Sequence, residues 1–293
     1  MSVTADAPAT VATARRAGRV AAWRREIGTP ATCAAGVIVL LMSVALLAPV
    51  LAPHDPAAVD LSQAYAGPSG DHLLGADGSG RDLLSRLIWG SRTALLGPMA
   101  LVLIATVVGA AIALVSAWLG GPFDSVISRV LDIVFAFPAV LLALVVAAMF
   151  GPGLTAAVIA LAIAYVPYVA RITRSEAIRQ RHMAYIQAGE LQGLSGWVIA
   201  RRHLLPNVMP LIVAQMTVSF GYAMVDLAAL SYLGVGVQAP TADWGAMVAS
   251  GQQGVIQGRP AESLWAGGLV VVVVVAAMLL GDRVGARDPE LTR

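Results

Sequence analysis

Long uncharged, apolar runs alternate along the chain with shorter segments that carry its charges. An α-helix rises about 1.5 Å per residue and the hydrocarbon core of a bilayer is about 30 Å thick, so roughly 20 apolar residues are needed to cross it. Runs of this length predict an all-α membrane protein with six transmembrane helices. The predicted spans lie within residues 27–53, 92–124, 132–171 (two spans), from about 210 past 225, and 263–281.

The run between Asp132 and Arg171 is too long for a single span. It holds 38 uncharged residues, which as one helix would measure about 57 Å. The sequence GPG at residues 151–153 interrupts it, because proline cannot continue a helix and glycine favours a turn. We therefore expect two spans joined by a tight hairpin at this point.

The composition agrees with a membrane protein. Of the 293 residues, 58% are hydrophobic and 12% are charged, with a mean hydropathy of +0.78, whereas a soluble domain carries about 25% charged residues. The single cysteine, Cys33, excludes an intrachain disulfide. The net charge of +2 is too small to suggest nucleic acid as a partner.

The positions of the basic residues predict the orientation of the spans. All 19 are arginine, because the chain contains no lysine. Loops rich in Lys and Arg stay in the cytoplasm, and with both termini on that side 15 of the 19 arginines are cytoplasmic. The predicted organisation is a cytoplasmic N-terminal tail (1–29), a first transmembrane helix (30–53), an extracytoplasmic segment (54–92), a five-helix core (93–282) with a cytoplasmic loop (173–207), and a cytoplasmic C-terminal tail (283–293).

The segment Tyr185–Asn207, YIQAGELQGLSGWVIARRHLLPN, stands between two apolar runs. Six arginines lie in or beside it, and each costs about 2.5–3.5 kcal/mol at the centre of a membrane helix, so the segment must lie in the cytosol or against another protein. The spacing of its apolar residues predicts a helix from about residue 183 to 191, formed on one face by Ala184, Tyr185, Ala188 and Leu191.

A second short helix is predicted directly after the first. Gly193 can adopt the positive φ that ends a helix, and Ser195 suits the N-cap of the next one. Pro206 should end this second helix before the following span. A helix, a glycine turn and a second helix make a compact knob suited to transmit force, although a solvated basic loop that only fixes topology is the alternative.

The same segment resembles the cytoplasmic EAA loop in permease subunits of binding-protein-dependent ABC importers. The family pattern is E-A-A, three residues, G, nine residues and I-x-L-P. The matching positions are Gln187, Ala188 and Gly189 for E-A-A, Gly193 for the glycine, His203 for the isoleucine, and Leu205 and Pro206 for the end. The spacing is kept throughout, while Gln187, Gly189 and His203 depart from the consensus.

Two further stretches resemble the C-type permeases of the oligopeptide, dipeptide and nickel branch. HLLGADGSGRDLLSRLIWGSRTALLG, at 72–97, is similar to the external H-L-L-G-T-D-x-x-G-R-D-x-x-S-R segment. LSYLGVGVQAPTADWGAMV, at 230–248, is similar to L-S-F-L-G-x-G-x-x-P-P-x-x-x-W-G. With DIVFAFPAVLLAL, the likeness extends from about residue 30 to residue 282.

The resemblance implies a type I ABC importer permease fold in a bacterial inner membrane, with peptides as substrates. It implies four kinds of partner: a homologous B-type permease, two ABC ATPase subunits, an extracytoplasmic substrate-binding protein and membrane lipid. The residues that it assigns to ATPase coupling are Tyr185, Gln187, Ala188, Gly189, Glu190, Gly193, Leu205 and Pro206. A P-loop needs a lysine, and this chain has none, so we expect ATP and Mg²⁺ on the partner ATPases and no catalytic site here.

Asp226 lies inside the fifth predicted span, where an ionisable side chain is costly. It either lines a translocation path or makes an interhelical contact, and Asp226, Tyr222 and Asp132 are the candidate path residues. Arg129 and Asp132, three residues apart, are also expected to pair. The histidines show no metal-ligand spacing, so no metal site is predicted. A nickel or glutathione importer of the same family, or an ion-coupled secondary transporter, remains the alternative, and the external segment either docks a partner or is a passive surface.

Overall fold

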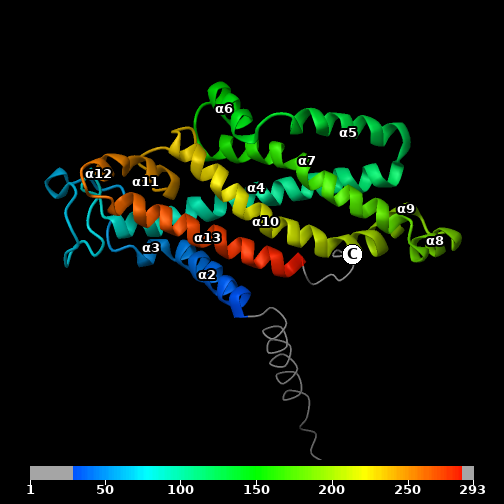
Figure 1. The fold of residues 1–293 in the computed structure, drawn as a ribbon, viewed down its shortest axis with the longest axis horizontal. Helices are drawn as coiled ribbons and strands as arrows, with labels where there is room; N and C mark the ends of the chain where they lie inside the picture. Colours follow the sequence, from blue (N-terminus) through cyan, green and yellow to red (C-terminus); the bar gives the residue numbers. More distant parts are fainter. Residues whose placement is uncertain (1–28, 286–293) are drawn as a thin grey trace, which may run out of the picture.

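The computed structural model describes residues 29–285, which form helices joined by short connections (Figure 1). The principal helices are α2 (Thr29–Leu46), α3 (Ala48–Leu51), α4 (Leu83–Leu119), α5 (Gly121–Phe135), α6 (Ala139–Phe150), α7 (Leu154–Arg181), α8 (Ala184–Leu191), α9 (Gly196–Ile199), α10 (Leu205–Tyr232), α11 (Trp244–Ser250), α12 (Gln252–Ile256) and α13 (Ala261–Gly285). A 3₁₀ turn covers Leu61–Gln63, and a π-helical turn covers Ala200–Leu204. Of the predicted tails (1–29 and 283–293), residues 1–28 and 286–293 lie outside the described residues, while Thr29 begins α2 and residues 283–285 end α13.

Four helices of the described region are long and apolar enough to cross a membrane. They are α4, α7, a continuous helix from Gly196 to Tyr232, and Ala261–Arg283 in α13. The pair α5 and α6 forms a further apolar unit, but it is bent by 80°. Pro30–Leu46 in α2 is apolar and shorter. The prediction of an all-α membrane protein is therefore confirmed with four to five candidate spans, and the number six stays a prediction.

The crossing of α4 and α7 organises the bundle. α4 packs along α7 and also contacts α2 and α10, while α10 packs against α13 (Figure 1). Gly109 allows the close approach, because a methyl group there would lie 3.0 Å from the Val166 carbonyl oxygen on α7. Helices in a bilayer associate through such close packing of small residues, since lipid supplies little hydrophobic drive between them.

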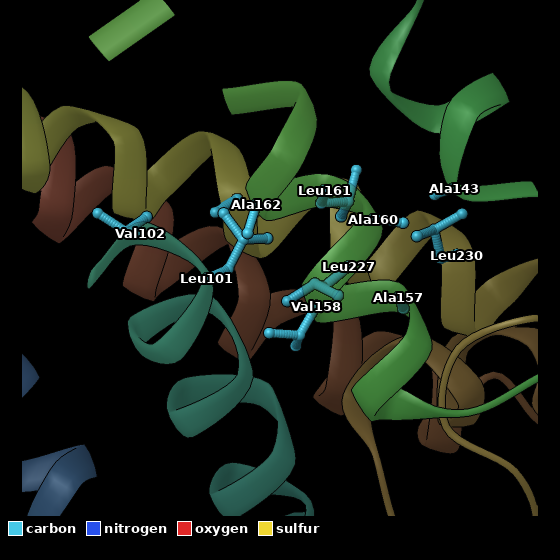
Figure 2. Packing of buried hydrophobic residues seen from close by; sticks show 11 residues of the cluster. Leu101, Val102, Ala143, Ala157, Val158, Ala160, Leu161, Ala162, Leu227 and Leu230 are labelled. Carbon is cyan, nitrogen blue, oxygen red and sulfur yellow. The ribbon is translucent and has the colours of Figure 1, made fainter. Parts of the chain in front are cut away.

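Small and branched apolar side chains fill the space between these helices (Figure 2). Leu101 from α4, Leu161 from α7 and Leu230 from α10 are fully buried in one cluster. A second cluster surrounds Trp244, whose indole Nε1 donates to the Leu87 carbonyl oxygen at 2.9 Å. The bundle thus holds α4, α7, α10 and α13 in fixed relation to one another.

Two helices begin before the spans that the sequence predicts. The second span was expected from Arg92, but α4 begins at Leu83 because Asp82 caps it: its side chain accepts from the Ser85 amide at 2.8 Å. The third span was expected to start near Asp132, but α5 begins at Gly121 and the chain breaks before Pro138, whose missing amide hydrogen cannot continue the helix. The predicted break at residues 151–153 is confirmed.

The expected pairing of Arg129 with Asp132 was also wrong. Asp132 instead accepts from Arg171 on α7 at 2.6 Å, which joins two helices rather than two positions on one helix. Arg174 and Asp124 form a second ion pair between α7 and α5. Both pairs attach α5 to the bundle.

Pro206 does not end the second helix of the loop. The helix continues from Gly196 to Tyr232, and Pro206 and Pro210 both lie inside it. A π-helical turn precedes Pro206, where the Leu205 amide bonds to the carbonyl of Ala200, five residues back. In this wider turn the carbonyl groups ahead of Pro206 are displaced from their α-helical positions, where one of them would clash with the proline ring. The helix therefore continues past Pro206.

Candidate functional site

The predicted helix-turn-helix segment forms a knob at one end of the bundle (Figure 1), and we use this name for residues 183–207. The first helix, α8, and the positive φ of Gly193 (+72°) are as predicted. The Gly193 amide donates to the Glu190 carbonyl at 3.0 Å, and the Leu194 amide donates to the Gly189 carbonyl at 3.1 Å. This pair of bonds is a Schellman motif, the termination that glycine favours. Ser195 occupies the N-cap of α9, but its side chain makes no capping bond.

The knob has a buried side and an exposed side. Ile186, Gly189 and Ile199 face inward, whereas Leu191 is 90% and Trp197 is 74% exposed. Of the predicted coupling residues, Gly189 is buried, Leu205 is half-buried and the others are exposed: Tyr185, Gln187, Ala188, Glu190, Gly193 and Pro206. The helical face predicted from 184, 185, 188 and 191 is therefore the exposed face, which leaves apolar side chains unpaired within the described structure.

Tyr185 connects the knob to the helices on either side of it. Its hydroxyl donates to Gln180 Oε1 on α7 at 2.6 Å and accepts from Asn207 Nδ2 on α10 at 3.2 Å. Gln180 in turn donates to Glu176 at 2.8 Å. Burial raises the pKa of the Tyr185 hydroxyl above its ordinary value, although the Asn207 bond acts in the opposite direction. The phenol therefore keeps its proton and the donor role.

The knob also rests on the end of α4, through residues that the sequence pattern did not single out. Trp118 packs so closely on Gly196 that a methyl group there would lie 2.5 Å from the indole ring. Arg181 donates to the carbonyl oxygens of Ala117 and Trp118 at 2.7 Å each, and its guanidinium stacks on the Trp118 ring at 5.1 Å. The knob thus contacts α4, α7 and α10.

Gln187 and Glu190 face a groove of about 490 Å³ at the base of the knob. Arg181 and His182 from the end of α7 and Ser116 from α4 lie on its other walls. The groove places these two predicted coupling residues beside polar side chains at the ends of α4 and α7.

A second polar site lies beside α10. Asp226 and Tyr222, two of the predicted path residues, line an open pocket of about 470 Å³ together with Tyr165, Tyr168, Phe135 and Phe137. The Tyr165 hydroxyl donates to Asp226 Oδ2 at 2.7 Å. The pocket combines one carboxylate with several aromatic rings, which is the combination that attracts an ammonium group.

Asp132, the third predicted path residue, does not line this pocket, because it is held at the surface by Arg171. The break between α5 and α6 contributes Phe137 and Pro138 to the lining instead. Tyr165 is the residue that sequence reasoning missed here. It lies 61 positions from Asp226, and no local spacing connects the two.

Known proteins resemble this chain in sequence and in fold. Residues 105–284 match the family model described as binding-protein-dependent transport system inner membrane component. The probable D,D-dipeptide transport system permease protein DdpC of Escherichia coli is 36% identical over 266 residues, which cover 89% of this chain and 87% of that protein. The nickel transport system permease protein NikC of Escherichia coli is 34% identical over 256 residues, with coverages of 87% and 92%. A chain of the MetNI methionine ABC transporter, in an inward-facing conformation, matches with a TM-score of 0.57 at 21% identity over 72% of this chain and 98% of that one, a likeness of fold.

Proposed function

The chain belongs to the family of binding-protein-dependent transport system inner membrane components, as a non-catalytic permease subunit of an ABC importer, and we propose that this importer takes up peptides and that the knob couples it to ATP hydrolysis. The observation that carries the coupling is the set of contacts from the knob to three helices. Tyr185 bonds to α7 and α10, and Trp118 on α4 packs against Gly196. A force applied to α8 therefore reaches all three.

In this proposal the exposed face of α8 docks in a groove of a partner ATPase. Leu191 is 90% exposed, which is unusual for a leucine beside a packed core and suits burial against another protein. ATP and Mg²⁺ belong to two ATPase subunits, because this chain contains no lysine for a P-loop. A homologous B-type permease completes the path, and a substrate-binding protein docks on the extracytoplasmic segment 54–92.

We further propose six spans in the inner membrane, with both termini in the cytoplasm. α2 followed by α3 would be the first span, and the bent pair of α5 and α6 would be the third. The knob is then cytoplasmic, which agrees with the arginines in and around it. Asp226 and Tyr222 face the path.

The substrate proposal rests on the pocket beside α10. The relative named for D,D-dipeptide transport is 36% identical and the one named for nickel transport is 34% identical, so identity alone separates them poorly. The pocket beside α10 favours the peptide: one carboxylate among aromatic rings suits the ammonium end of a peptide, whereas Ni²⁺ prefers imidazole or thiolate ligands.

The test is gentle detergent purification of the tagged full-length chain from its native membrane, with mass spectrometry of the proteins that accompany it. We expect a second permease and P-loop ATPases. A Leu191→Glu variant should recover the second permease but at least tenfold less ATPase, since central apolar anchors dominate interfaces. Leu73→Glu is the matched control, because Leu73 is also an exposed leucine (61%) but lies outside the knob.

Two results would contradict the proposal. A homogeneous homo-oligomer without ATPase, from membranes where other ABC complexes survive the detergent, would favour a secondary transporter. Equal ATPase recovery with Leu191→Glu and with the wild type would remove α8 from the docking surface. For the substrate, uptake of labelled peptides is compared with uptake of Ni²⁺ in cells that lack or express the chain.

A further inference from the structure

Three side chains with metal-binding atoms meet at the end of the bundle opposite the knob. His54 follows α3, His72 lies in the connection to α4, and Asp82 is the N-cap of α4. Their ligand atoms all lie within 4.8 Å of one another. His72 Nδ1 is 2.9 Å from Asp82 Oδ1, and His54 Nδ1 is 3.9 Å from Asp82 Oδ2. The two imidazole rings are 5.2 Å apart between centroids.

We propose that His54, His72 and Asp82 form a binding site for a divalent transition metal ion, with Zn²⁺ as its occupant. Zinc binds imidazole nitrogen and carboxylate oxygen at about 2.0–2.2 Å, so two ligand atoms of a tetrahedral site are roughly 3.3 Å apart. The separations of 2.9 and 3.9 Å lie on either side of this value. Two nitrogen donors and one carboxylate favour zinc over Mg²⁺ and Ca²⁺, which prefer oxygen ligands.

Backbone contacts hold each ligand in position before any ion binds. Asp82 is fixed because its Oδ2 accepts from the Ser85 amide at 2.8 Å. The Ser85 hydroxyl in turn accepts from the His54 amide at 3.0 Å. The His72 amide donates to Ser69 Oγ at 3.0 Å. Such outer contacts orient the ligands of a metal site and reduce the order that binding must impose.

The site leaves one coordination position towards solvent. The side chain of His54 is 42% exposed and that of His72 is 18% exposed, while Asp82 is buried at 1%. Three protein ligands with an open fourth position fit a water ligand and an exchangeable ion. The bound ion would join the segment after α3, the connection containing His72, and the start of α4. The ion therefore stabilises this end of the molecule, whatever the permease imports.

Binding replaces one contact of the metal-free chain. His72 Nδ1 and Asp82 Oδ1 share a hydrogen bond, and a ligating nitrogen must give up its proton, so the ion and that proton compete. His72→Gln is the informative variant, because its amide can still donate to Asp82 but is a poor zinc ligand. Asp82→Asn keeps an acceptor for the Ser85 amide and removes the anionic ligand.

The experiment uses the full-length chain, purified through a tag without histidine and with Cys33→Ser to remove the one thiol. The chelator-treated protein is dialysed against buffered free Zn²⁺ in the presence of excess Mg²⁺, and bound metal and thermal unfolding are measured. We expect one zinc per chain and a higher unfolding midpoint with zinc. His54→Gln, His72→Gln and Asp82→Asn should each weaken zinc binding at least tenfold.

His203→Gln is the matched control, since His203 lies in the knob, and this variant should bind zinc as the wild type does. Two results overturn the proposal. One is a His54→Gln, His72→Gln double variant that has the thermal unfolding midpoint of the wild type and binds as much zinc as the wild type does. The other is a wild-type chain that takes up no more zinc than the double variant, or that loses its zinc to Mg²⁺.

Discussion

A single methyl group added at Gly193 should loosen the knob, while the same group added at Gly189 should tighten it. Gly193 has φ of +72°, and the added Cβ would meet no atom within 4 Å, so the cost is conformational only. A side chain in the left-handed region costs about 1–2 kcal/mol. At Gly189, inside α8, the Cβ would lie 3.5 Å from Leu194 Cδ1, an ordinary contact, and alanine there is favoured over glycine by about 0.5–1 kcal/mol.

These energies translate into local opening of the turn. A cost of about 1–2 kcal/mol changes the ratio of closed to open turn by roughly 5–30-fold. The Leu194 amide, which bonds to Gly189 in the closed turn, is the reporter of that ratio. Exchange of the Leu194 amide, measured by mass spectrometry, should be roughly 5–30-fold faster in Gly193→Ala than in the wild type. In Gly189→Ala the same amide should exchange more slowly than in the wild type. Peptides from α4 and α7 should exchange as in the wild type, because the change is confined to the knob.

Transport provides the second measurement. Gly193→Val adds a β-branched side chain to the same strained backbone, and we expect the chain to reach the membrane at normal abundance while uptake falls and the partner ATPases continue to hydrolyse ATP. Unchanged exchange at the knob in Gly193→Ala would refute the structural step. Normal uptake by Gly193→Val at normal abundance would refute the role of the knob in coupling.

Three further variants test other contacts. Tyr185→Phe removes the bond to Gln180, and leaving the Gln180 side-chain oxygen unpaired should cost about 1–3 kcal/mol, seen as faster hydrogen exchange at the ends of α7 and α8; unchanged exchange would contradict it. Asp226→Asn removes the only carboxylate among the described residues that line the pocket, and peptide uptake should fall at least tenfold at equal abundance, since a hydrogen bond to a charged group contributes about 1.5–3 kcal/mol. Gly109→Leu should separate α4 from α7 and destabilise the protein by about 1–3 kcal/mol in detergent unfolding; Gly268→Leu, where a Cβ has open space, is the control and should leave the midpoint unchanged.

The parts of the structure that sequence reasoning predicted are those set by neighbouring residues. The knob's glycine turn depends on the backbone freedom of Gly193, and the break at 151–153 depends on its own proline and glycines, so both can be recognised locally. Pro206 failed as a helix end because the π-helical turn before it adjusts the backbone, which a proline alone does not reveal.

The contacts that build the candidate sites come from distant positions. Trp118 is far from Gly196 in the chain and contacts it only because the end of α4 lies against the start of α9. His54 and His72 have no metal-ligand spacing in sequence, yet the start of α4 brings both to Asp82. Contacts between such distant residues depend on how whole helices pack against one another, and the pattern of a single segment does not contain that information.

The continuous helix from Gly196 to Tyr232 connects the two candidate sites of the permease directly. Gly196 begins it in the knob, and Asp226 lies on it beside the pocket, so the two are about 45 Å apart along the axis at 1.5 Å per residue. A tilt of about 5° at Pro206 or Pro210, roughly 24–30 Å from Asp226 along the axis, would move Asp226 sideways by about 2–3 Å. Pro206 and Pro210 remove amide donors near its base, which makes that end the easiest place to bend. This helix can therefore transmit a change in its tilt angle from the knob to the pocket.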